Sequence, residues 1–152
     1  MTDHWQPTRR QVLQLLAAAG TLAGVGPLGA GAGRAQPADE IRTRAIPSSG
    51  EPVPVVGLGT ARTFDVGTSE AERAPLREVL RRFFDYGGRV IDTSPMYGNA
   101  ETVIGDLLGQ IDHPEVFYAT KVWTRGEQAG IRQMEQSMAR MNTDVIDLMQ
   151  VH

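Results

Sequence analysis

Short apolar runs of strand length alternate with amphipathic helical patterns along residues 55–152. The alternation repeats about every 30 residues, which is the size of a strand–helix–strand unit. Neighbouring parallel strands must be joined by a long crossover, and such crossovers are almost always right-handed. The sequence therefore predicts an α/β fold with a parallel sheet, as either a doubly wound sheet or part of a (β/α)8 barrel.

Four strands and three helices make up this predicted pattern. The strands are expected at residues 55–60, 90–91, 116–119 and 145–151. Each helix is recognised by apolar residues at spacings of three and four, and glycines are expected to end the first two. The apolar stripes are Leu76, Val79, Leu80, Phe83 and Phe84; Val103, Ile104, Leu107 and Leu108; and Ile131, Met134, Met138 and Met141.

A β-hairpin is expected before the first strand–helix unit. Residues 43–46 and 53–56 would form its arms, and the Pro-Ser-Ser-Gly stretch at residues 47–50 supplies turn residues between them. Further along the chain, Ser69 and Glu72 have the spacing of a capping box. The first long helix is therefore expected to begin at Ser69.

Residues 1–35 have the features of an export signal. Thr8-Arg9-Arg10 is followed by an apolar stretch at residues 12–28, which ends in small residues. Residues 33–35 (Gly-Arg-Ala) are the expected cleavage site. This order is typical of a cleaved signal peptide, and the paired arginines resemble the twin-arginine type. We expect export to the periplasm or beyond by the twin-arginine machinery, with no stable membrane insertion after cleavage. The alternative is an uncleaved anchor, although a membrane span needs roughly 20 apolar residues.

Charge and composition narrow the function of the remaining domain, residues 36–152. The whole chain has a formal net charge of −3, which argues against nucleic-acid binding. It has no cysteine, so disulfides and thiolate metal sites are excluded. Only one of its 15 basic residues is a lysine, Lys121. Because the surroundings of an amine can tune its pKa, whereas a guanidinium is always charged, this lysine is a candidate for chemistry.

Polar side chains follow three successive strands of the predicted sheet. Asp92, Lys121 and His152 come directly after the second, third and fourth strands, and Tyr97 lies on the loop beyond Asp92. The carboxyl ends of parallel strands meet at one face, where α/β proteins carry their chemistry. Each residue alone has an ordinary structural explanation, but four at equivalent positions predict a shared site.

The four side chains suit proton transfer to a carbonyl oxygen. A phenol has a pKa of about 10, and a nearby ammonium lowers such a pKa because it favours the phenolate. A carboxylate would hold the lysine charged and oriented, while a histidine would orient the substrate. Since no side chain supplies a hydride, reduction of a carbonyl by this group requires a nicotinamide cofactor.

Several segments resemble the aldo-keto reductase family. Residues 88–101 (Gly-Arg-Val-Ile-Asp-Thr-Ser-Pro-Met-Tyr-Gly-Asn-Ala-Glu), followed by Ile104-Gly105, are similar to the family signature around its catalytic Asp and Tyr. Residues 119–122 (Ala-Thr-Lys-Val) resemble the segment holding its lysine, and residues 144–152 resemble the strand ending in its histidine. Residues 57–60 resemble the first barrel strand, and the hairpin resembles the plug under the barrel.

The resemblance implies an NADPH-dependent reductase of an aldehyde or ketone, on the N-terminal half of a (β/α)8 barrel. Tyr97 would be the general acid, with Lys121 and Asp92 tuning it. His152 would polarise and orient the carbonyl, and no metal is expected. The other implied contacts are Gly59, Thr60 and Asp92 for the cofactor and Trp123 for the substrate.

Two other functions stay open from the sequence. One is a non-catalytic binding or regulatory module of the same fold. The other, an unrelated barrel enzyme such as a sugar isomerase, lacks a metal-ligand cluster, because the only histidines are His4, His113 and His152. In the family, the later strands and their loops hold most of the cofactor. We therefore expect this chain to be a fragment of a longer reductase that binds NADPH weakly or not at all.

Overall fold

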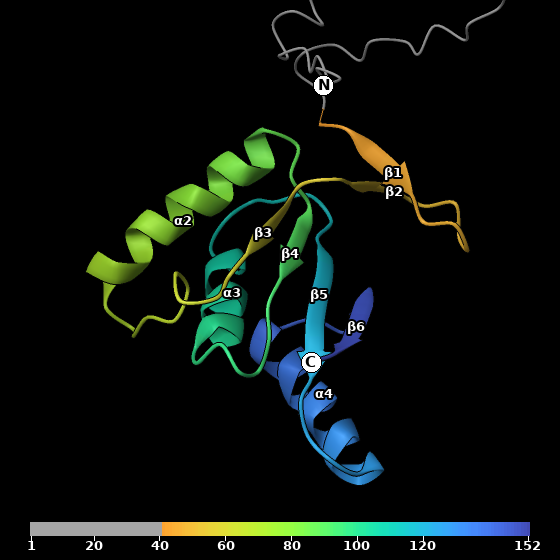
Figure 1. Ribbon diagram of the computed structural model, residues 1–152. Helices are drawn as coiled ribbons and strands as arrows, with labels where there is room; N and C mark the ends of the chain where they lie inside the picture. The colour runs from red at the N-terminus through yellow and green to blue at the C-terminus, as the bar shows by residue number, and fades with distance from the viewer. Residues whose placement is uncertain (1–40) are drawn as a thin grey trace, which may run out of the picture. The chain divides into compact units, whose positions relative to one another are not determined.

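The structure, a computed structural model, describes residues 41–152. The predicted export signal at residues 1–35 lies outside the described residues. A two-stranded hairpin precedes a four-stranded sheet and three helices, in the order expected for strand–helix units (Figure 1).

The main sheet consists of β3 (Gly57–Gly59), β4 (Val90–Asp92), β5 (Phe117–Val122) and β6 (Leu148–Val151). All three neighbouring pairs are parallel, and the spatial order β3-β4-β5-β6 is also the order along the chain. A doubly wound sheet reverses its strand order at a switch point, whereas a barrel adds each new strand beside the last one. The topology therefore agrees with part of a (β/α)8 barrel.

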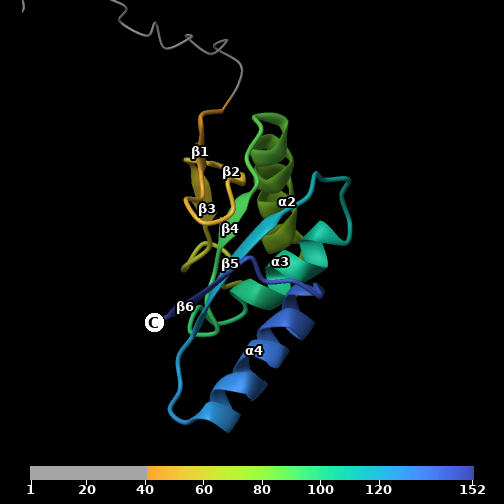
Figure 2. The same cartoon turned by 90° about the vertical axis from the view of Figure 1, so that its right-hand side faces the viewer.

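Helices α2 (Glu70–Asp85), α3 (Ala100–Leu108) and α4 (Glu127–Met141) connect the strands. Figure 2 shows all three on one side of the sheet, as in the outer ring of a barrel. The capping prediction for α2 is confirmed, because the Ser69 side chain accepts a hydrogen bond from the backbone N–H of Glu72. Within residues 41–152, no helix has the length and apolar character that crossing a membrane requires.

The hairpin consists of β1 (Thr43–Ala45) and β2 (Pro52–Pro54), which pair antiparallel as predicted. Gly50 closes its turn with a φ of +76°, which a glycine adopts at little cost. Figure 1 shows the hairpin near the start of β3, away from the carboxyl ends of β4 and β5. The expected buried strand at residues 55–60 is wrong in part: Val55 and Val56 are exposed and only residues 57–59 pair with β4.

The core lies between the sheet and the helices. The apolar stripes of α2 and α3 pack there with Ile91 of β4. Helix α3 ends after Leu108, and Gly109 is its C-cap residue. Val79 of the predicted α2 stripe and Ile131 of the predicted α4 stripe are instead exposed. The buried stripe residues are Leu76, Leu80, Phe84, Val103, Ile104, Leu107, Leu108 and Met141.

The last strand is shorter than the predicted range of residues 145–151. Its first part forms a turn instead, in which the Thr143 hydroxyl donates to the Val145 carbonyl and accepts from the Val145 N–H. The Asp147 carboxylate then accepts a hydrogen bond from the Tyr118 backbone N–H at 2.7 Å. Burial, and then the charge of Asp147, raises the pKa of the Tyr118 phenol. These polar contacts replace strand pairing up to Leu148.

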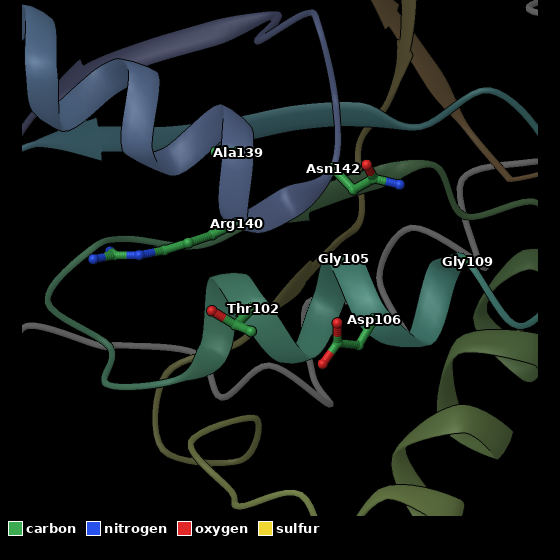
Figure 3. A pocket seen from close by; sticks show the side chains of 7 residues that line it. All are labelled: Thr102, Gly105, Asp106, Gly109, Ala139, Arg140 and Asn142. Carbon is green, nitrogen blue, oxygen red and sulfur yellow. The ribbon is translucent and has the colours of Figure 1, made fainter.

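Helices α3 and α4 approach closely at Gly105. A Cβ at this position would overlap the Arg140 carbonyl oxygen and lie 2.8 Å from the carbonyl carbon of Met141. Figure 3 shows Gly105 facing the last turn of α4 beside a shallow hollow between the two helices. The two charged residues of that hollow, Asp106 and Arg140, already pair with Arg73 and Glu101. We therefore do not assign chemistry to this hollow.

The α3–α4 contact leads to a stability prediction. Gly105→Ala should lower the free energy of unfolding by about 1–3 kcal/mol, because the added methyl group has backbone atoms in its way. The matched control is Gly109→Ala, since a Cβ there meets its nearest atoms at 3.6 and 3.8 Å and the backbone is helical, with φ −63°. Urea denaturation measures both. Equal stabilities for the two variants would contradict the proposed helix contact.

Candidate active site

The carboxyl ends of β4, β5 and β6 bring the predicted residues together. Asp92 is the last residue of β4 and pairs with Ala119 of β5. Lys121 lies two residues beyond Ala119, so both side chains point to the same face of the sheet as Asp92. His152 directly follows β6 and its backbone N–H donates to the Val122 carbonyl at 3.0 Å.

Lys121 occupies the centre of this group. Its Nζ donates to Asp92 Oδ2 at 2.8 Å and to the Thr93 carbonyl at 2.7 Å. It also lies 5.1 Å from the centroid of the Tyr97 ring. An ammonium has three N–H donors. Two are engaged by Asp92 and Thr93, which leaves the third available for another acceptor.

Asp92 divides its two carboxylate oxygens between two strands. Oδ2 accepts from Lys121, and Oδ1 accepts from Nε2 of Gln150 at 2.9 Å. The Lys121 side chain is 13% exposed and the Asp92 side chain 39% exposed. The ion pair is thus shielded on the lysine side while the carboxylate stays reachable from the surface.

The backbone around Asp92 is held on both sides. The Asp92 carbonyl accepts from the N–H and from the hydroxyl of Thr60, each at 3.1 Å. The N–H of Thr93 donates to the Ala119 carbonyl at 2.9 Å. Thr60 is fully buried. Its hydroxyl therefore anchors the end of β4, and its contact with a cofactor stays a prediction.

Tyr97 is returned over the strand ends by a tight turn. Its backbone N–H donates to the Ser94 carbonyl at 3.0 Å, and the Ser94 hydroxyl accepts from the Met96 N–H at 3.2 Å. The Tyr97 ring is partly buried against the core and meets the His152 ring edge-on, with centroids 6.3 Å apart. The phenol-bearing ring thus stands between the amine and the imidazole.

Asp65 fixes the other side of the Tyr97 turn. Its carboxylate accepts from the Asn99 backbone N–H at 2.9 Å, across 34 positions of sequence. Asn99 is the residue before α3 and its own side chain makes no capping bond. Gly98 has a φ of +58° and packs directly against Asp65, which leaves no room for a side chain there. Asp65 therefore stabilises the start of α3 from a distant loop.

The predicted cofactor and substrate residues flank this group. Gly59 pairs with Asp92 in the sheet, and a Cβ on it would meet nothing within 4 Å. Trp123 is 55% exposed. The side chain of Gln133, on α4, accepts a hydrogen bond from the Trp123 backbone N–H and donates one to the Trp123 carbonyl. Beside it, a hollow of about 460 Å³ is lined by Val122, Trp123, Thr124, Arg125, Val151 and His152.

A buried carboxylate supports β5 from its opposite face. Glu101 is 1% exposed and accepts from the Thr120 hydroxyl at 2.8 Å. Its second oxygen pairs with Arg140 of α4 at 3.2 Å. Because Thr120 precedes Lys121, this contact holds the strand residue next to the amine.

Within residues 41–152 no group of three or more His, Asp or Glu side chains is arranged to hold a metal.

Sequence reasoning did not find Gln150, Asp65 or Glu101 as members of the site. Gln150 carried a usable signal, because a polar residue at an inward position of a short apolar strand needs a partner. Asp65 carried none, since its partner is a backbone group on another loop. Glu101 belongs to the segment that resembles the family signature, but that resemblance assigned it no contact.

A family model agrees with this geometry. The model described as "Aldo/keto reductase family" matches residues 55–152. The chain belongs to the aldo/keto reductase family. Its fold is accordingly the first part of that family's (β/α)8 barrel, preceded by the hairpin.

Curated and solved aldo/keto reductases are similar to about two thirds to three quarters of the chain. Methylglyoxal reductase YeaE of Escherichia coli is 36% identical over 104 residues, which are 66% of this chain and 35% of that protein. A Klebsiella pneumoniae aldo-keto reductase solved with NADPH is 34% identical, with a TM-score of 0.57 over 68% of this chain and 36% of the other.

A second Klebsiella pneumoniae structure extends the similarity. This aldo/keto reductase, solved with NADP and acetate, is 30% identical, with a TM-score of 0.59 over 75% of this chain and 39% of the other. The chain thus spans about a third of the length of the curated relatives it matches.

Asp65 provides a test of how the Tyr97 turn is held in this aldo/keto reductase chain. Asp65→Ala should lower the free energy of unfolding by roughly 1 kcal/mol, since α3 then loses its only side-chain cap in the structure. It should also speed hydrogen exchange at the Asn99 amide. Asp112→Ala, which changes an exposed acid before β5, is the control. Unchanged exchange at Asn99 in the Asp65 variant would contradict this role.

Proposed function

We propose that this chain carries the proton-transfer site of an NADPH-dependent reductase that converts an aldehyde or ketone to an alcohol. The observation that carries the proposal is the placement of Lys121. Its Nζ is bonded to Asp92 and to the Thr93 carbonyl, at 2.8 and 2.7 Å, and lies 5.1 Å from the Tyr97 ring centroid. An ammonium fixed beside a phenol can stabilise the negative charge that the phenol gains as it donates its proton.

Each side chain of the group has one task in this proposal. Tyr97 gives its phenolic proton to the carbonyl oxygen as the carbonyl carbon gains a hydride. Lys121 stabilises the phenolate that remains, and Asp92 keeps the ammonium in place. His152, whose ring meets the Tyr97 ring edge-on, orients the carbonyl oxygen toward the phenol. A proton and a hydride together convert the carbonyl to an alcohol.

Gly59 at the end of β3 and Asp92 at the end of β4 fit a nicotinamide cofactor. Gly59 presents open space where any other residue would place a side chain, so a flat ring can approach the backbone. The Asp92 carboxylate is 39% exposed and can accept from a sugar hydroxyl. When bound, NADPH supplies the hydride. Two similar structures were solved with NADP or NADPH, which supports this choice.

The hollow next to His152 suits a small carbonyl substrate. It is bordered by Trp123, which offers an apolar face, and by Arg125, which offers a cation. Methylglyoxal is a suitable first substrate, because one similar curated protein is a methylglyoxal reductase. We assign Trp123 to substrate binding on this basis.

Tyr97→Phe tests the proposal most directly. At an NADPH concentration high enough to occupy a weak site, the purified full chain should oxidise NADPH when methylglyoxal is added. The variant should turn over about 10²–10⁴-fold more slowly, because it has no proton to donate. Tyr86→Phe is the matched control, since Tyr86 is 73% exposed at the end of α2 and should leave the rate unchanged. The fall in NADPH absorbance with time gives the rate for the wild type and for both variants.

Two results would contradict the proposal. If the wild-type chain binds NADPH but does not oxidise it with any carbonyl, the non-catalytic binding or regulatory module is favoured instead. If Tyr97→Phe oxidises NADPH as fast as the wild type, Tyr97 is not the acid.

We further propose that the chain is exported through the twin-arginine route. The support is the order of features in residues 1–35, with Arg9 and Arg10 before an apolar stretch. This route carries folded proteins, which suits a domain that needs a cofactor.

Replacing the arginine pair tests the export proposal. The double variant Arg9→Lys with Arg10→Lys should accumulate in the cytoplasm of a bacterial host that has the twin-arginine machinery, as measured by fractionation and immunoblotting. Arg34→Lys, which leaves the pair intact, should be exported like the wild type. Export of the double variant at the wild-type level would contradict the route.

A further inference from the structure

We propose that Gln150 is a positioning residue that orients Asp92, and through it directs Lys121 toward Tyr97. This inference rests on the proposed function, in which Lys121 acts on the Tyr97 phenol. Gln150 lies on β6, directly beside Lys121 in the parallel register. Its side chain reaches past its neighbour to the end of β4, where Nε2 lies 2.9 Å from Asp92 Oδ1.

The chemistry of the contact fixes the orientation of the amide. A carboxylate only accepts hydrogen bonds, so the NH₂ end of Gln150 must face Asp92. The two oxygens of Asp92 then have separate donors, Gln150 on Oδ1 and Lys121 on Oδ2. A carboxylate held at both oxygens cannot rotate about its terminal bond without breaking one of these contacts.

The position of Asp92 decides where the lysine protons point. The ammonium is held by one side-chain oxygen and by the Thr93 carbonyl, and the second of these is part of the backbone. If the Asp92 carboxylate turns, the ammonium turns with it about the Thr93 contact. The position of the ammonium relative to the Tyr97 ring then changes. Gln150 thus acts on Tyr97 through two intermediates, Asp92 and Lys121.

The side chain of Gln150 can be removed without disturbing the strand. The pairing of β5 and β6 uses backbone groups of Lys121 and Gln150, which any residue supplies. Methionine has nearly the same length and volume as glutamine and no donor. Gln150→Met therefore deletes the hydrogen bond to Asp92 while it keeps the packing.

The sole lysine of the chain provides a readout that does not depend on catalysis. Protein labelled with ¹⁵N at the lysine side chain gives one lysine signal, that of Lys121. In the wild type, hydrogen bonds to Asp92 and Thr93 should slow exchange of the ammonium protons with water. In Gln150→Met, exchange should be at least about tenfold faster and the signal should move. Gln136→Met, an exposed glutamine on α4, should leave the signal unchanged.

Kinetics supply the second readout. Gln150→Met should lower kcat about tenfold, part of the roughly 10²–10⁴-fold that a positioned proton donor contributes. It should leave KM for the carbonyl within about twofold, because the side chain of Gln150 is engaged with Asp92 and its proposed role lies in proton transfer. Gln150→Glu, which has the same shape, should lower kcat further, since its carboxylate repels Asp92 and gives it no donor.

The outcomes separate the two proposals. A Lys121 signal in Gln150→Met that matches the wild type, or a change in KM with kcat unchanged, would overturn the role of Gln150. A wild-type chain that reduces no carbonyl would overturn the proposed function, while the lysine signal would still show whether Gln150 holds the pair. A thermal midpoint within a few degrees of the wild type confirms that each variant is folded.

Discussion

The ion pair between Asp92 and Lys121 is the constraint around which the rest of the site is arranged. Placing two charges in a partly buried position costs desolvation energy, and the attraction between them repays it only when further hydrogen bonds are added. Both partners have such bonds, to Gln150 and to the Thr93 carbonyl. A pair of apolar residues would satisfy the fold with less difficulty. We infer that the pair is kept for its chemistry, with the β4–β5 register as the means of forming it.

The alternation of parallel strands with helices and the shared face of Asp92, Lys121 and His152 were predictable because both follow from local patterns, whereas the pattern alone left the strand order open. Parallel strands ending in polar residues place those residues at one edge whatever the details of packing. The exact bounds were less predictable. β3 and β4 have three residues each, too few for a periodic signal, and the hydrogen bonds of Thr143 and Asp147 shortened β6. Only the three-dimensional arrangement could show these side-chain contacts.

The same reasoning explains which site residues were missed. Asp65 acts on a backbone N–H that is 34 positions away, and a sequence contains no record of such a partner. Gln150 differs, because its neighbour Lys121 and its partner Asp92 were both already candidates. Once the parallel register is known, a glutamine beside Lys121 on the same face has Asp92 within reach as an acceptor. Thr60 also supports the strand end through its bond to the Asp92 carbonyl, and its expected contact with the cofactor stays a prediction.

Glu101 changes how sequence variation in this chain should be interpreted. Its carboxylate is 1% exposed and depends on Arg140, whose side chain is 41% exposed on α4. By its exposure alone, Arg140 would be classed as a surface residue whose replacement is harmless. Such a change would nevertheless leave the buried Glu101 carboxylate without its counterion, two side chains away from the Lys121 amine. Mutational scans of this domain should therefore record sensitivity on its outer surface, at a residue that no inspection of the candidate site alone would select.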